Sequence, residues 1–217
     1  MTELVLPAPA KLNLFLHVLG RRDDGYHELQ TLFQLLDHGD ELTFRRRRDG
    51  VVAVTVEPPL AGVAECDNLV YRAALALRAL RPSPEGVDIH IRKRLPPGGG
   101  LGGGSSDAAT ALVGLDRLWG LDLGEEELCR LGLGLGADVP VFIRGRTAWG
   151  EGIGERLTPV ALPPAWYLVV KPDCAIATAA VFAHPQLTRN TPPMKIRAFF
   201  GEGAGNDCAA VVEAMYP

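Results

Sequence analysis

Residues 96–106 read PPGGGLGGGSS, and this run of six glycines constrains the fold more than any other stretch of the chain. Glycine offers no side chain for packing and loses more backbone entropy on folding than any other residue. Alternating apolar residues predict a strand over 86–95, and apolar residues at helical spacing predict a helix after the run, capped by Ser105 or Ser106. A glycine turn between a strand and a helix N-terminus collects backbone amides and positive dipole charge, so a phosphate-binding loop is expected.

Two well-known phosphate loops do not match this run. A Walker loop requires lysine where Ser105 stands. The spacing of Gly98, Gly100 and Gly103 satisfies the dinucleotide fingerprint, but six glycines satisfy many patterns, and no acidic residue ends a second strand at the required place. These mismatches favour a third class of phosphate-binding loop.

The flanking sequence has the pattern of a mixed α and β protein. The first strand, over 11–20, is expected to bury one face and to leave Lys11 and Asn13 on the other; the buried residues are Leu12, Leu14, Leu16 and Val18. The segment 28–37 fits a helix or a strand. Further strands are expected over 40–47, 51–57 and 166–172, and helices after an N-cap at Asp67, in 125–136 and in 178–185.

Composition argues against several function classes. The net charge of −4 does not favour nucleic acid or an anionic membrane as the partner, and the basic run Arg45–Arg48 is interpreted as a solvated strand end. The four cysteines are scattered without metal-site spacing, which predicts reduced thiols in a cytoplasmic protein. Neither a signal peptide nor an apolar stretch of about 20 residues is present.

Four motifs carry a resemblance to a known family. The string LPPGGGLGGGSSDAAT (95–110) resembles the second signature motif of the GHMP kinases. Segments of one branch of that family are similar to residues 7–31, to LGADVPVFIRG (135–145) and to RNTPP (189–193). The resemblance implies an α+β, two-domain GHMP kinase fold. Its N-terminal domain, like domain 2 of ribosomal protein S5, would cover 1–156, and a C-terminal α+β domain would begin at 157. The family's third glycine-rich motif does not occur before residue 217, so this second domain (157–217) is expected to be truncated.

The resemblance also implies an enzyme that uses ATP, with Mg²⁺ carried by the nucleotide, to phosphorylate an alcohol. Asp138 would be the catalytic base, either directly or through a water molecule, and Lys11 would lie beside it and hold it ionised. Asn68 would contact adenine, although it is equally suited to cap a helix. The ATP phosphates would be wrapped by Pro96, Pro97, Gly98, Gly99, Gly100, Leu101, Gly102, Gly103, Gly104, Ser105 and Ser106.

The expected partner is a small molecule, a cytidine diphosphate-methylerythritol, and the expected oligomeric state is monomer or homodimer. Tyr26 and His27 would recognise the cytidine, by stacking and by hydrogen bonding to the base edge. Asn13, Thr178 and Phe182 would complete the substrate site, although Phe182 is equally suited to the core. On their own, Tyr26 fits a tyrosine packed on its hairpin and His27 fits an exposed histidine.

Three other functions stay open at the level of sequence. One is another GHMP kinase, acting on homoserine, mevalonate or a sugar; the segment GYHELQT (25–31) argues against it. A nicotinamide-dependent oxidoreductase would rest on the accidental dinucleotide fingerprint. A nucleic-acid-binding module would rest on the S5-like fold and the run Arg45–Arg48, against the acidic net charge.

Overall fold

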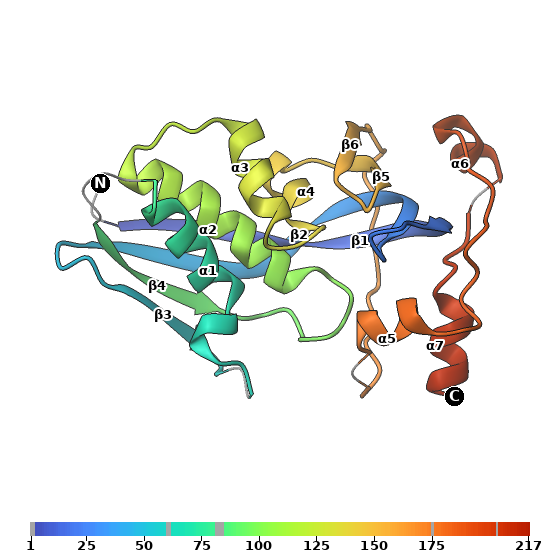
Figure 1. Cartoon of the computed structure of the whole chain (residues 1–217), viewed down its shortest axis with the longest axis horizontal. Helices are drawn as coiled ribbons and strands as arrows, with labels where there is room; N and C mark the ends of the chain where they lie inside the picture. The colour runs from blue at the N-terminus through green and yellow to red at the C-terminus, as the bar shows by residue number, and fades with distance from the viewer. Residues whose placement is uncertain (1–2, 60–61, 81–84, 175, 203) are drawn as a thin grey trace. The chain divides into compact units, whose positions relative to one another are not determined.

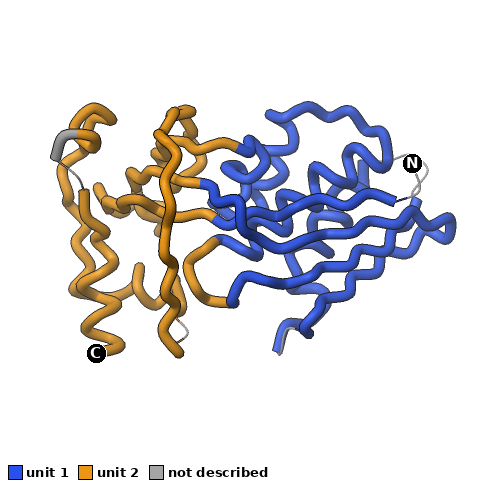
Figure 2. The backbone as a smooth tube through the Cα atoms, turned by 180° about the vertical axis from the view of Figure 1, so that it is seen from behind, with its two compact units in different colours: residues 1–10, 35–96, 102–145 blue, residues 11–34, 97–101, 146–217 orange. Residues whose placement is uncertain are grey.

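The computed structural model describes residues 3–59, 62–80, 85–174, 176–202 and 204–217. The chain divides into two compact units, which are described separately below (Figure 2). Unit 1 comprises residues 1–10, 35–96 and 102–145, and unit 2 comprises residues 11–34, 97–101 and 146–217. The two long strands β1 (Glu3–Arg21) and β2 (His27–Arg47) pair with each other and contribute residues to both units. The domain division expected at residue 156 stays a prediction.

Unit 1 is a sheet covered on one face by helices. The second half of β2 pairs antiparallel with β4 (Gly86–Arg92), and β4 pairs parallel with β3 (Val52–Glu57). Helix α1 (Leu69–Arg78) connects the two parallel strands, as parallel pairing requires, and α2 (Gly103–Trp119) lies beside it on the same face (Figure 1). The side chains that the strands and α2 direct into the core are fully buried; they include Leu42, Phe44, Ile89, Leu112 and Leu115.

Two glycines allow the helices of unit 1 to pack closely. A Cβ atom at Gly114, on α2, would lie 2.8 Å from the ring of Phe44. A Cβ atom at Gly132, on α3 (Glu125–Leu133), would lie 2.7 Å from Val139 in α4 (Val139–Arg144). Such distances leave no room for a larger residue, so both glycines are needed for packing.

Unit 2 is built on the first half of β2. This part pairs antiparallel with β5 (Ala148–Gly152), which pairs with β6 (Arg156–Pro159). Three short helices follow: α5 (Thr178–Ala183), α6 (Ile196–Glu202) and α7 (Ala209–Met215). One apolar cluster consists of Phe15, Leu32 and Trp149, and a second consists of Val18, Val181, Leu187 and Val211.

The structure settles the ambiguous segment 28–37 as strand, and the helix expected in 178–185 is confirmed as α5. The expected N-cap at Asp67 is wrong. Asp67 ends the 3₁₀ helix η1 (Glu65–Asp67), and the carboxamide oxygen of Asn68 caps α1 by accepting a hydrogen bond from the Val70 amide at 2.9 Å. Asparagine and aspartate cap equally well, so composition could not distinguish the two positions.

Two expectations about strands are also wrong. In β1, Val18 is fully buried as expected, but Leu12, Leu14 and Leu16 are only half-buried. Lys11 and Phe15 on the opposite face are buried, because the apolar clusters of unit 2 include residues from both faces of the strand. Residues 166–172 form no strand; Trp166 is 99% exposed. A strand needs a neighbour for its backbone groups, and 166–172 has none in the part of the chain that the structure describes.

Candidate active site

The glycine run forms a turn that requires glycine at alternate positions. Gly98, Gly100 and Gly102 have φ angles of +69°, +70° and +74°, in the left-handed region that side chains disfavour. A Cβ atom at Gly100 would meet nothing within 4 Å, so no described residue fills the space beside the loop there. The turn therefore presents bare backbone, as the sequence led us to expect.

The turn leads directly into the N-terminus of α2. Gly102 is the N-cap, and the expected caps Ser105 and Ser106 are wrong: both lie within the helix. No acidic residue stands in the first turn, so the amides of Gly103, Gly104 and Ser105 keep their positive character. The hydroxyl of Ser106 is fully buried and has no hydrogen-bond partner among the described residues.

A buried cluster of three charges lies beneath this helix end. The Lys93 ammonium contacts the carboxylates of Asp40 and Asp107, the latter at 2.8 Å, and all three side chains are at most 10% exposed. The second oxygen of Asp40 accepts hydrogen bonds from the amides of Arg94 and Leu95, at 2.5 and 2.8 Å. A Cβ atom at Gly103 would lie 3.3 Å from the Lys93 ammonium nitrogen. The cluster thus holds the segment that enters the glycine turn.

Sequence reasoning missed this cluster. Its members are separated by 53 and 14 residues, and nothing local connects them. The available signal was Asp107 itself, because an acidic residue within the small, buried stripe of α2 requires a partner.

The cluster makes stability depend on pH. Burial raises the pKa of Asp107 to about 6, although the Lys93 ammonium acts in the opposite direction. Burial lowers the pKa of Lys93, but the two carboxylates outweigh it, so the net direction is upward. Because the folded protein holds the Asp107 proton more tightly than the unfolded chain, ionisation of Asp107 reduces stability as the pH rises from about 4 to about 6.

In the Asp107→Asn variant this loss of stability should disappear. A shift of about two pKa units corresponds to about 3 kcal/mol. The difference in unfolding free energy between the variant and the wild type should therefore change by up to that amount in favour of the variant between about pH 4 and pH 7. Denaturant unfolding across that range measures the difference, with the exposed Asp23→Asn as control. Parallel pH curves for the wild type and Asp107→Asn would contradict the expectation.

A valine at Gly102 should weaken ATP binding by about tenfold or more, equivalent to at least about 1.4 kcal/mol. A β-branched residue disfavours the φ of +74°, so the turn would move and its amides would lose their common direction. Gly120→Val is the matched control, since Gly120 caps the far end of α2 at φ +64°. Calorimetric titration with ATP compares the two; equal losses of affinity would contradict a role for the turn.

Asp138 stands at the N-cap position of α4, where its side chain makes no capping hydrogen bond. It is half-buried. The segment that contains Asp138 lies close to the start of α2, since a Cβ atom at Gly136 would lie 3.7 Å from the Ser105 hydroxyl. Asp138 therefore belongs to unit 1, together with the helix end that starts at Gly103.

Lys11 belongs to unit 2, and its pairing with Asp138 stays a prediction. Its ammonium donates to the Asn13 carboxamide oxygen at 2.5 Å, and the Asn13 amide group donates to the Thr31 hydroxyl at 2.7 Å. The backbone amide of Lys11 donates to the carbonyl of Leu101 at 2.9 Å, which ties β1 to the glycine turn. Lys11 and Asn13, two expected site residues, are thus brought together beside the turn.

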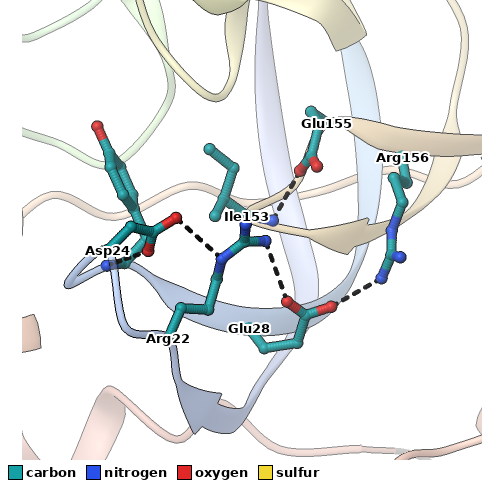
Figure 3. Close-up of polar contacts among 7 residues, drawn as sticks. Arg22, Asp24, Glu28, Ile153, Glu155 and Arg156 are labelled. Carbon is teal, nitrogen blue, oxygen red and sulfur yellow. Dashed lines mark hydrogen bonds and ion pairs between the residues drawn. The ribbon is translucent and has the colours of Figure 1, made fainter.

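Tyr26 lies in an exposed turn between β1 and β2. Tyr26 is 59% exposed, and its backbone amide donates to the Asp24 carboxylate at 3.0 Å. Arg22 pairs with Asp24 and with Glu28, and Glu28 also accepts a hydrogen bond from Arg156 at 2.7 Å (Figure 3). Exposed ion pairs add little stability, but these orient the turn against β6.

His27 is buried rather than exposed. Its ring lies against that of Phe182, with centroids 5.1 Å apart and a tilt of 32°. Phe182 also packs on the second apolar cluster of unit 2, so it contacts both the core and the expected substrate residue. Thr178 is the first residue of α5 and is exposed.

The residues present fit a phosphate-bearing nucleotide. The left-handed glycines, the helix end without acidic residues and the unpartnered Ser106 hydroxyl are all suited to phosphate oxygens. Among the described residues, no group of three histidine, cysteine, aspartate or glutamate side chains could hold a metal ion. No helix in the described parts of the chain has the length and apolar character needed to cross a membrane.

Comparison with known proteins identifies the class of this site. Residues 68–146 match the family model for the GHMP kinases N terminal domain, so the glycine turn and α2 lie within a GHMP kinase domain. A homoserine kinase structure from Cytophaga hutchinsonii is 19% identical over 90% of this chain and 62% of its own, with a TM-score of 0.58, and shows the fold alone.

Closer relatives narrow the class. The chain is 58% identical to 4-diphosphocytidyl-2-C-methyl-D-erythritol kinase of Ectopseudomonas mendocina and 59% identical to that of Pseudomonas aeruginosa strain LESB58, over 99% of this chain. It spans 73% and 76% of those relatives. A crystal structure of 4-(cytidine 5'-diphospho)-2C-methyl-D-erythritol kinase is 36% identical, covers 99% of this chain and 79% of its own, and has a TM-score of 0.79. The chain belongs to the 4-diphosphocytidyl-2-C-methyl-D-erythritol kinase family.

Proposed function

We propose that this protein transfers the terminal phosphate of ATP to the 2-hydroxyl group of 4-diphosphocytidyl-2-C-methyl-D-erythritol, in the non-mevalonate route to isoprenoids. The observation that carries the proposal is the turn of left-handed glycines that opens onto the N-terminus of α2, in a chain 58% identical to kinases of this name. The enzyme would work in the cytoplasm as a monomer or homodimer, without nucleic acid or membrane.

The residues of the chain have distinct parts in this reaction. The amides at the start of α2 hold the phosphates of ATP, and Ser105 and Ser106 offer hydroxyls to phosphate or to Mg²⁺. Bound ATP with Mg²⁺ supplies the transferable phosphate. Asn68 caps α1 through its carboxamide oxygen, which leaves its NH2 group to donate a hydrogen bond to adenine.

Asp138 accepts the proton of the attacking hydroxyl; its place in the motif LGADVPVFIRG (135–145) and the suitability of a carboxylate as a general base support this role. Lys11 and Asn13 bind the acceptor end of the substrate, and their mutual hydrogen bond fixes the direction of the ammonium group. Tyr26, His27 and Phe182 bind the cytidine, with Thr178 at the rim. The proton passes from the substrate oxygen to the Asp138 carboxylate as the new phosphate bond forms.

Phosphate transfer by the purified protein tests the proposal. With ATP, Mg²⁺ and the cytidine-linked alcohol, phosphorus NMR should show a new phosphate ester and release of ADP. Homoserine, mevalonate and galactose, tested in parallel, should not be phosphorylated at a comparable rate. Equal turnover of acceptors that lack cytidine would favour another GHMP kinase instead.

A further inference from the structure

One nitrogen of His27 is occupied by an arginine from a distant part of the chain. His27 begins β2 and is 9% exposed, and the Nε–H group of Arg189 donates a hydrogen bond to its Nε2 atom at 3.1 Å. Arg189 lies in the loop after α5, 162 residues away in sequence. This contact joins the segment GYHE (25–28) to the segment RNTPP (189–193). The proposed function gives this contact no role.

Arg189 is held in place by three backbone carbonyl groups. Its Nη2 atom donates to the carbonyls of Phe182 and His184 at 2.8 and 2.9 Å, and Nη1 donates to that of Leu187 at 3.1 Å. These carbonyls lie at and after the C-terminal end of α5, where helical carbonyls lack partners. The guanidinium therefore has a fixed direction, and it fixes Phe182 relative to His27.

Arginine determines which proton His27 carries. A guanidinium group only donates hydrogen bonds, and it stays charged at neutral pH. The Nε2 atom of His27 must therefore accept, so a neutral His27 ring carries its proton on Nδ1. The pKa of His27 is lowered, first by burial and then by the charges of Arg189 and Arg21, which keeps the ring neutral near pH 7.

We propose that Arg189 is a positioning residue that sets base specificity by holding His27 as a neutral Nδ1–H donor. The ring nitrogen N3 of cytosine accepts a hydrogen bond, whereas N3 of uracil carries a hydrogen. A donor fixed at Nδ1 therefore matches cytosine and opposes uracil. This inference rests on the proposed function, in which His27 contacts the base of the substrate.

The tautomer of His27 can be measured without any ligand. In long-range ¹H–¹⁵N spectra of protein labelled at histidine, the His27 signals should show a neutral ring protonated on Nδ1. In Arg189→Met the proton should move partly or fully to Nε2. Arg21→Gln is the matched control: it removes a nearby charge that acts on the His27 ring only through its electric field, so the tautomer should not change. An Nε2–H tautomer in the wild type would overturn the inference, even if Arg189→Met fails to fold.

The specificity can be measured by binding alone, with CDP and UDP as probes. The wild type should bind CDP more tightly than UDP. In Arg189→Met the ratio of the Kd for UDP to the Kd for CDP should fall by about tenfold, or about 1.4 kcal/mol. An unchanged ratio in Arg189→Met would overturn the inference. A protein that prefers CDP and has the Nδ1–H tautomer but transfers no phosphate would support the inference and contradict the proposed function.

Discussion

Replacing Asp138 with asparagine should lower kcat by about 10²–10⁴-fold and leave the Kd for ATP nearly unchanged. Asparagine has almost the same size and shape as aspartate, so the start of α4 should keep its structure. Its carboxamide cannot take a proton from the attacking hydroxyl at neutral pH. The loss should therefore fall on the chemical step rather than on nucleotide binding.

Steady-state kinetics and calorimetric ATP titration of the same preparation separate these two effects. Asp122→Asn is the matched control, because Asp122 is exposed and its positive φ of 52° suits asparagine as well as aspartate. The control should retain full kcat. Wild-type turnover in Asp138→Asn would show that Asp138 is not the base, and a parallel loss of ATP affinity would assign it to binding instead.

Replacing Lys93 with methionine should destabilise the protein by about 3–5 kcal/mol. The substitution removes the only cation that the structure shows on the buried carboxylates of Asp40 and Asp107 within the described residues. The two buried carboxylates would then face each other without a cation, so Asp107 must either take up a proton or stay buried as an unpaired charge. ATP affinity should fall as well, because Asp40 also holds the backbone that enters the glycine turn.

Denaturant unfolding and ATP titration measure both consequences of Lys93→Met. Lys195→Met serves as the control at an exposed lysine and should be close to neutral. The double variant Lys93→Met/Asp107→Asn should recover part of the lost stability, since it leaves one buried charge instead of two. A single variant as stable as the wild type would show that the cluster does not hold the turn.

The glycine turn could be predicted because its signals are local. Alternating apolar residues before Gly98 and a helical stripe after Gly104 give the strand–turn–helix order without any knowledge of the rest of the chain. The glycines permit left-handed φ angles, but which of them adopt these angles is known only from the structure. The position of the helix start was wrong by a few residues, because serine is a good cap but glycine can also end the turn.

The supporting contacts could not be predicted, since they join distant segments. Lys93 meets Asp40 across 53 residues, and Arg189 meets His27 across 162 residues. Local periodicity contains no information about such pairs. The failure at 166–172 has the same origin: an apolar run forms a strand only where a neighbour accepts its backbone hydrogen bonds.

A crystal structure with a non-hydrolysable ATP analogue and Mg²⁺ tests the central claim most directly. We expect the phosphates to lie within hydrogen-bond distance of the backbone amides from Gly103 to Ser105, at the N-terminus of α2. A triphosphate bound elsewhere, with those amides facing only solvent, would contradict the assignment of the glycine turn as the nucleotide site.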